Sequence, residues 1–138
     1  MKNIESHKTT HIKYENIEAD IDTEIAPLIK ELWKADMLTL ASCECNIDDK
    51  VWIQFDNPYT AAYFLSIVLC SRSFKKEIFC ENHTDSWHYC CHPYYIKKEA
   101  HGIKGEVIEF ATCVYFPRVH LERVFTQVKL NNLKDKVE

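Results

Sequence analysis

The chain of 138 residues is 46% hydrophobic and carries a formal net charge of −4. This length suits one domain with a sizeable core, and the weak negative charge gives no general attraction to nucleic acid or anionic membrane. No apolar run approaches the roughly 18 residues of a membrane span, and the N-terminal residues lack the apolar core of a signal peptide. We therefore expect an intracellular, cytoplasmic protein without a membrane anchor.

The first half of the chain predicts an edge strand, a helix and two further strands. Residues 11–17 carry spaced apolar side chains that favour a short strand. A helix with Pro27 in its first turn follows. Its apolar stripe consists of Ile25, Leu28, Ile29, Leu32 and Trp33. Strands are predicted at 37–43 and 51–55, with the polar link 44–50 between them.

The second half predicts a helix, a long hairpin and a final helix. Asn57-Pro58 starts a helix that reaches about residue 71 and is apolar almost all round, which favours burial between layers or in a homodimer contact. Two long strands are predicted at 87–97 and 106–116, joined by a glycine-containing link. Pro117 opens the last helix.

The predicted order is β-α-β-β-α-β-β-α, which indicates a single α+β domain over residues 1–138. We expect one antiparallel or mixed sheet with helices packed on one face, and fraying at 1–10 and 134–138. Alternation along the strand at 106–116 places Ile108, Phe110, Val114 and Phe116 on the helix-covered face. The opposite, mixed face is expected to be open or covered by a second copy.

The chain has seven cysteines and a histidine-rich strand, which together suggest a metal-binding site. In a reducing compartment, free thiols or metal ligation are better defaults than disulfides. The metal candidates are His88, Cys90, His92, Cys80 and His83. Zinc takes about four such ligands and is the alternative to a protein without a cofactor. The simpler interpretation is that the histidines form hydrogen bonds at a wet face while cysteines such as Cys113 pack.

Aromatic and histidine side chains on the strands offer a binding surface. The binding candidates are Trp52, Tyr89, His88, His92 and Tyr115. Such aromatics can stack on bases beside a positive groove, but the lysines are few and the net charge is negative. A protein partner or a second copy is therefore favoured over nucleic acid. Ser42-Cys43 ends a strand and could display a nucleophile, although no local motif pairs this thiol with a histidine.

The segment 22–55 resembles uncharacterised small proteins of phages and large DNA viruses. The resemblance rests on the helix at 23–33, TEIAPLIKELW, and on the strand end at 39–45, TLASCEC. The same helix, strand and Ser-Cys turn is locally similar to wybutosine-synthesis methyltransferases that act on transfer RNA. Glu44 and Cys45 follow the Ser-Cys pair where those families carry a glycine, and no catalytic residue is carried over.

These observations predict a non-enzymatic binding or protein-interaction module, as a viral accessory or virion protein, that uses the mixed sheet face. The alternative is a metal- or thiol-dependent enzyme that acts on RNA or a nucleotide. Metal content and oligomeric state are the properties that separate the two.

Overall fold

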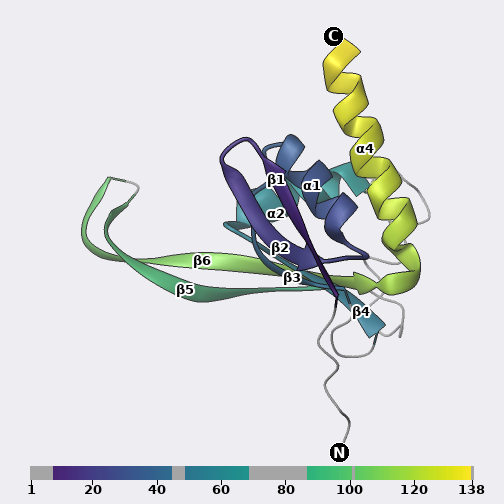
Figure 1. The fold of residues 1–138 in the computed structure, drawn as a ribbon. Coiled ribbons are helices and arrows are strands. Elements are labelled where there is room, and N and C mark those ends of the chain that lie inside the picture. The colour runs from purple at the N-terminus through teal and green to yellow at the C-terminus, as the bar shows by residue number, and fades with distance from the viewer. Residues whose placement is uncertain (1–7, 45–48, 69–86, 101, 138) are drawn as a thin grey trace, which may run out of the picture.

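The computed structural model describes residues 8–44, 49–68, 87–100 and 102–137 (Figure 1). Its elements are β1 (Thr9–Tyr14), β2 (Ile17–Asp22), α1 (Ala26–Lys34), β3 (Thr39–Cys43), β4 (Lys50–Phe55), α2 (Pro58–Val68), β5 (His88–Ala100), β6 (Ile103–Pro117), a 3-10 turn (Arg118–His120) and α4 (Leu121–Val137). Regular structure therefore reaches into both of the segments expected to fray. No helix in the described part of the chain combines the length and apolar character needed to cross a bilayer.

The fold has two layers. Four strands form an antiparallel sheet in the order β3-β4-β6-β5, and the helices α1, α2 and α4 lie over one of its faces (Figure 1). This arrangement confirms the predicted α+β class with helices on one face of an antiparallel sheet. The other face carries no helix among the described elements.

The N-terminal region is a hairpin, so the strand predicted over 11–17 is confirmed as far as Tyr14, while Ile17 starts a second strand that was not predicted. β1 and β2 pair antiparallel as a separate two-stranded sheet, and Glu15 in the turn has a φ of +53°. Ile12 and Ile21 are buried in the common core, while most other side chains of the hairpin face water. Ile17, Ala19 and Ile21 alternate strictly with acidic residues, and all three pack in or against the core, so β2 was predictable from its alternation.

The predicted stripe of the first helix is confirmed, because all five of its apolar side chains are buried. They belong to one core with Val51, Ile53 and Phe55 of β4 and with Val124 and Val128 of α4. Burial of this kind supplies the main favourable term in folding. The spacing of apolar residues thus positions α1 and α4 over the sheet, as the sequence predicted.

α2 begins where Asn57-Pro58 predicted. The side-chain oxygen of Asn57 accepts a hydrogen bond of 2.9 Å from the backbone N–H of Thr60, which satisfies one of the free donors at the helix start. The helix buries Ala61, Phe64, Ile67 and Val68. Tyr59 is 86% exposed and lies on the outer side. Packing within the chain therefore explains most of its apolar character, without a subunit contact.

β5 and β6 form a hairpin that extends well beyond the helices (Figure 1). We call residues 93–110 the hairpin arm. Pairing between β4 and β6 ends at Phe55 and Thr112, so the arm has only its own two strands. Val114 and Phe116 are buried under the helices as predicted, but Ile108 and Phe110 are 51% and 44% exposed. Their predicted burial is wrong, because β6 is longer than the body that covers it.

Candidate functional site

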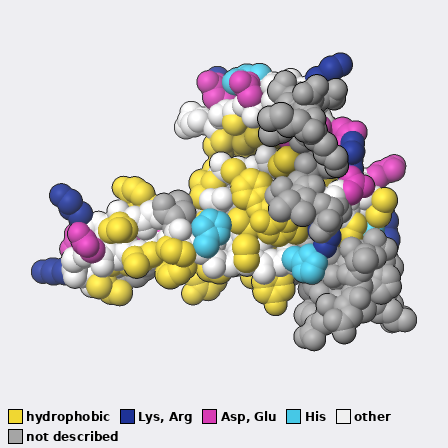
Figure 2. Space-filling model, turned by 90° about the horizontal axis from the view of Figure 1, so that it is seen from below, with side chains coloured by type: hydrophobic (Ala, Val, Ile, Leu, Met, Phe, Trp, Pro, Cys, Tyr) yellow, Lys and Arg dark blue, Asp and Glu magenta, His cyan; other side chains and the backbone are white. Residues whose placement is uncertain are grey.

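The face of the sheet away from the helices is built from rows of paired residues across three strands. In the order β4-β6-β5, two neighbouring rows are Trp52–Tyr115–His88 and Gln54–Cys113–Cys90. His92 follows Cys90 on the same face of β5, opposite Ala111. Figure 2 views the molecule from this side and shows histidine side chains within a largely hydrophobic surface that continues onto the hairpin arm.

Three potential metal ligands meet on this open face. The ligand atoms of Cys90, His92 and Cys113 all lie within 4.8 Å of one another. The Sγ of Cys113 is 3.9 Å from the Nδ1 of His92 and 4.0 Å from the Oε1 of Gln54. Cys113 is buried, His92 is half-buried and Cys90 is exposed. The group therefore lies against the sheet on one side and is open to solvent on the other.

Burial controls the chemistry of the Cys113 thiol. Desolvation, followed by the nearby Cys90, raises the pKa of Cys113 to about 11, while the indole N–H of Trp52 acts in the opposite direction. The pKa of Tyr115 is raised as well, first by burial and then by Cys90 and Cys113. Both groups are protonated at neutral pH. Cys113 is therefore a poor nucleophile in the absence of a metal.

A buried donor adjoins the cluster. Trp52 contacts Tyr115 with tilted rings whose centroids are 6.4 Å apart. Its Nε1 is buried and has no hydrogen-bond acceptor at normal distance within the described part of the chain. A buried N–H without a partner costs free energy. A hydrogen bond from this N–H would therefore stabilise a negatively charged sulfur at the neighbouring Cys113.

The structure brings together some of the predicted metal ligands. Cys90 and His92 belong to the cluster, whereas His88 lies one row away beside Tyr115 and is not part of it. Cys80 and His83 lie outside the described residues.

Cys113 was interpreted as a packing residue, and it is indeed buried, but it is also the third member of the cluster. Counting outward from the pair Ala100–Ile103 aligns Cys90 with Cys113, because the two register shifts between these pairs cancel. Hairpin register was the signal in the sequence that could have identified it.

The predicted binding residues divide between the two faces. Trp52, Tyr115, His88 and His92 share the open face. Tyr89 pairs with Val114 and therefore lies on the helix side of the sheet, where it is 66% exposed. Tyr89 marks the start of a second exposed surface, which continues along the hairpin arm.

This second surface is the continuation of the core face beyond the helices. Paired residues of an antiparallel ribbon project to the same side. The pairs Tyr89–Val114, Cys91–Thr112, Pro93–Phe110 and Ile96–Ile108 thus follow one another along one face. We call the exposed members the arm apolar surface: Tyr89, Cys91, Pro93, Ile96, Ile108 and Phe110. Such a row of exposed apolar side chains is a candidate interaction surface.

The difference in exposure between the cysteines gives a first testable prediction. Cys90 and Cys91 are exposed, whereas Cys113 is 1% exposed. In native, reduced, metal-free protein, iodoacetamide is expected to modify Cys113 at least about tenfold more slowly than Cys90 and Cys91, because alkylation needs an accessible thiolate. Peptide mass spectrometry over a time course measures the three rates, with urea-unfolded protein as the control. Equal rates in the native protein would contradict the placement of Cys113.

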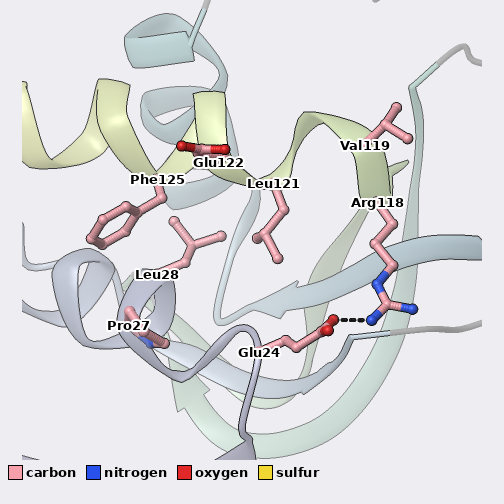
Figure 3. Close-up of a pocket in the computed structure, with 8 residues that line it drawn as sticks. All are labelled: Glu24, Pro27, Leu28, Arg118, Val119, Leu121, Glu122 and Phe125. Atoms are coloured by element: carbon pink, nitrogen blue, oxygen red, sulfur yellow. Dashed lines mark hydrogen bonds and ion pairs between the residues drawn. The ribbon is translucent and has the colours of Figure 1, made fainter.

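A cavity of about 450 Å³ lies between α1 and the start of α4 (Figure 3). Its walls are Glu24, Pro27, Leu28, Arg118, Val119, Leu121, Glu122 and Phe125. Arg118 forms an ion pair with Glu24 and lies 3.8 Å from Asp49. Since carboxylates already neutralise this guanidinium, the cavity is not arranged to bind an anion. Its polar side instead links the start of α1 to the turn before α4.

Comparisons of the chain with protein-family models, with curated proteins and with solved structures gave no match. The resemblance to small viral proteins and to the methyltransferases therefore stays a prediction. The geometry of the chain's own side chains is the basis for assigning a function.

Proposed function

We propose that the protein is a non-enzymatic interaction module that associates with a second copy of itself through the hairpin arm. One observation carries the proposal: Ile108 and Phe110 lie on the same face of β6 as the core residues Val114 and Phe116, yet they are exposed. The chain extends a core-like face beyond the elements that cover its first part. A surface of this kind gains free energy when a partner removes it from water.

The arm apolar surface is suited to burial against a flat partner. It is one face of a two-stranded ribbon, and a register shift between Pro93 and Tyr95 keeps Ile96 on the same face as Pro93. Each apolar Å² removed from water contributes about 25 cal/mol. Burial of several large side chains at once is needed to offset the entropy lost on association, and the arm supplies them in a single patch.

Charge on the arm favours a second copy as the partner. Residues 93–110 carry equal numbers of acidic and basic side chains, namely Lys97, Lys98, Lys104, Glu99, Glu106 and Glu109. In a two-fold contact each copy presents the same patch, so a patch with both signs can be complementary to itself. Nucleic acid requires a predominantly positive surface, which this arm does not provide.

The resemblance of the segment 22–55 to small phage and viral proteins supports a role as a viral accessory or virion protein. A module that assembles through a projecting arm suits such a role, whether in the cytoplasm of the host or in the particle. The interaction proposal itself does not depend on this origin.

A double substitution on the arm tests the proposal. Ile108→Glu with Phe110→Glu places two like charges in each copy of the contact, and we expect the dissociation constant of the dimer to rise about 100-fold or more. Val119→Glu is the matched control, because Val119 is 75% exposed and lies outside the arm. Light scattering coupled to size exclusion measures all three proteins. If the double variant and Val119→Glu associate alike, the arm is not the contact.

An enzyme is the second candidate, and the observation that favours it is the cluster of Cys90, His92 and Cys113. Zinc with three protein ligands and a fourth, open position is typical of catalytic centres. Hydrolysis of RNA or a nucleotide by zinc-loaded protein, with activity lost in His92→Ala and kept in the Ile108→Glu, Phe110→Glu variant, would favour the enzyme over the interaction module.

A further inference from the structure

We propose that Cys90, His92 and Cys113 bind one Zn²⁺ ion at the base of the hairpin arm, on the open face of the sheet. The site is independent of the association proposed above, because its ligands lie on the face opposite to the arm apolar surface. Geometry, the chemistry of the donors and a buried hydrogen-bond donor each support it.

The geometry is nearly that of a bound ion. In a tetrahedral zinc centre with bonds of about 2.0–2.3 Å, neighbouring ligand atoms lie about 3.3–3.8 Å apart. In the structure, the three ligand atoms all lie within 4.8 Å of one another, and the Sγ of Cys113 lies 3.9 Å from the Nδ1 of His92. Small side-chain rotations, with no change in strand pairing, bring all three atoms to one ion.

The register of the hairpin fixes this arrangement. Cys90 and Cys113 are directly paired across the two strands, and His92 is two residues along β5 on the same face. Two ligands from one strand and one from its neighbour converge without any loop. Because the backbone positions are held by the ladder, the ligands are largely preorganised, which reduces the entropy lost on binding.

The donor set selects the type of metal. Two thiolates and an imidazole suit Zn²⁺, whereas Mg²⁺ and Ca²⁺ prefer oxygen ligands. The exposed side of the group, at Cys90, leaves the fourth position of the tetrahedron accessible to water. The three residues therefore form a centre with three protein ligands and one exchangeable position.

The indole N–H of Trp52 is the independent observation. It is buried without an acceptor at normal distance within the described residues, and Trp52 lies on the same sheet face as Cys113, one row away on the neighbouring strand. A zinc-bound thiolate is a strong acceptor, and hydrogen bonds to ligand atoms orient them and adjust their affinity for the metal. A metal on Cys113 would thus supply an acceptor for a donor that has none at normal distance among the described residues.

Titration of the full, reduced chain with Co²⁺, followed by displacement with Zn²⁺, tests the site. We expect one Co²⁺ per chain, with the absorption bands of tetrahedral cobalt and sulfur-to-cobalt charge transfer, and loss of these bands when Zn²⁺ is added. His92→Ala and Cys113→Ser should each weaken the affinity about 100-fold or more. His92 is half-buried, so its variant reports on the site even if Cys113→Ser fails to fold.

Cys91→Ser is the matched control, because Cys91 is adjacent in sequence but projects from the other face of β5 and is exposed. Its affinity for Co²⁺ should equal that of the unaltered chain. The proposal is overturned if no stoichiometric Co²⁺ or Zn²⁺ binds, if the chain binds Cu⁺ but neither of these ions, or if His92→Ala and Cys91→Ser bind equally well. The last result would place the metal on other cysteines.

Discussion

Replacing Trp87 by alanine is expected to lower the free energy of unfolding by about 3–5 kcal/mol, the range for removing a large buried aromatic side chain. Trp87 is buried directly before β5, and its ring lies 4.9 Å from that of Phe116 and 6.3 Å from that of Phe64. Its indole N–H also donates to the Nδ1 of the buried His120 at 3.1 Å. The substitution therefore removes packing and a buried hydrogen bond together.

Urea denaturation measures this change, and two variants separate its causes. Trp87→Phe keeps most of the packing and loses the donor to His120, so a smaller loss of about 1–3 kcal/mol is expected. Tyr59→Ala removes an aromatic side chain that is 86% exposed and should change stability by less than about 0.5 kcal/mol. A loss below about 1 kcal/mol for Trp87→Ala would contradict the placement of this side chain in the core.

Removal of the hairpin arm is expected to abolish self-association while the body stays folded. In this variant Asn-Gly replaces residues 93–110 and closes the pair His92–Ala111 with a two-residue turn. Four of the six members of the arm apolar surface are lost: Pro93, Ile96, Ile108 and Phe110. None of the side chains that form the hydrophobic core is touched. The dissociation constant of the dimer should rise about 100-fold or more, the effect of losing the central contacts of an interface.

The arm-deleted chain also separates the two proposals. It keeps Cys90, His92 and Cys113, so its affinity for Co²⁺ should be unchanged if the zinc site is correct. Circular dichroism and cooperative thermal unfolding serve as the control for folding. Undiminished association of a folded, arm-deleted chain would exclude the arm as the contact.

The elements built on regular apolar spacing were predictable. A regular apolar spacing indicates that one face of an element is buried. The five apolar residues of the first-helix stripe are buried as expected, and so are Val51, Ile53 and Phe55 in β4. Asn57 was recognisable as a helix cap because capping depends only on local geometry at the start of the helix.

The errors arose where burial depends on how far neighbouring elements extend. Ile108 and Phe110 alternate just as Val114 and Phe116 do, but pairing with β4 ends at Thr112. A period of two identifies a face of a strand, and it does not say whether a helix covers that face.

The candidate site was half predictable, because ligands on one strand share a face by alternation whereas a ligand on the next strand depends on register. The face shared by Cys90 and His92 followed from their spacing. Cys113 required the pairing of β5 with β6. This pairing also places the open face and the arm apolar surface on opposite sides of the hairpin at the base of the arm.

Sedimentation equilibrium of the unaltered 138-residue chain over a hundredfold range of concentration tests the central claim most directly. The claim predicts a weight-average mass that rises from the single-chain value of 16.3 kDa toward twice that value, and a curve that a monomer–dimer equilibrium describes. A mass of 16.3 kDa at every concentration would contradict it.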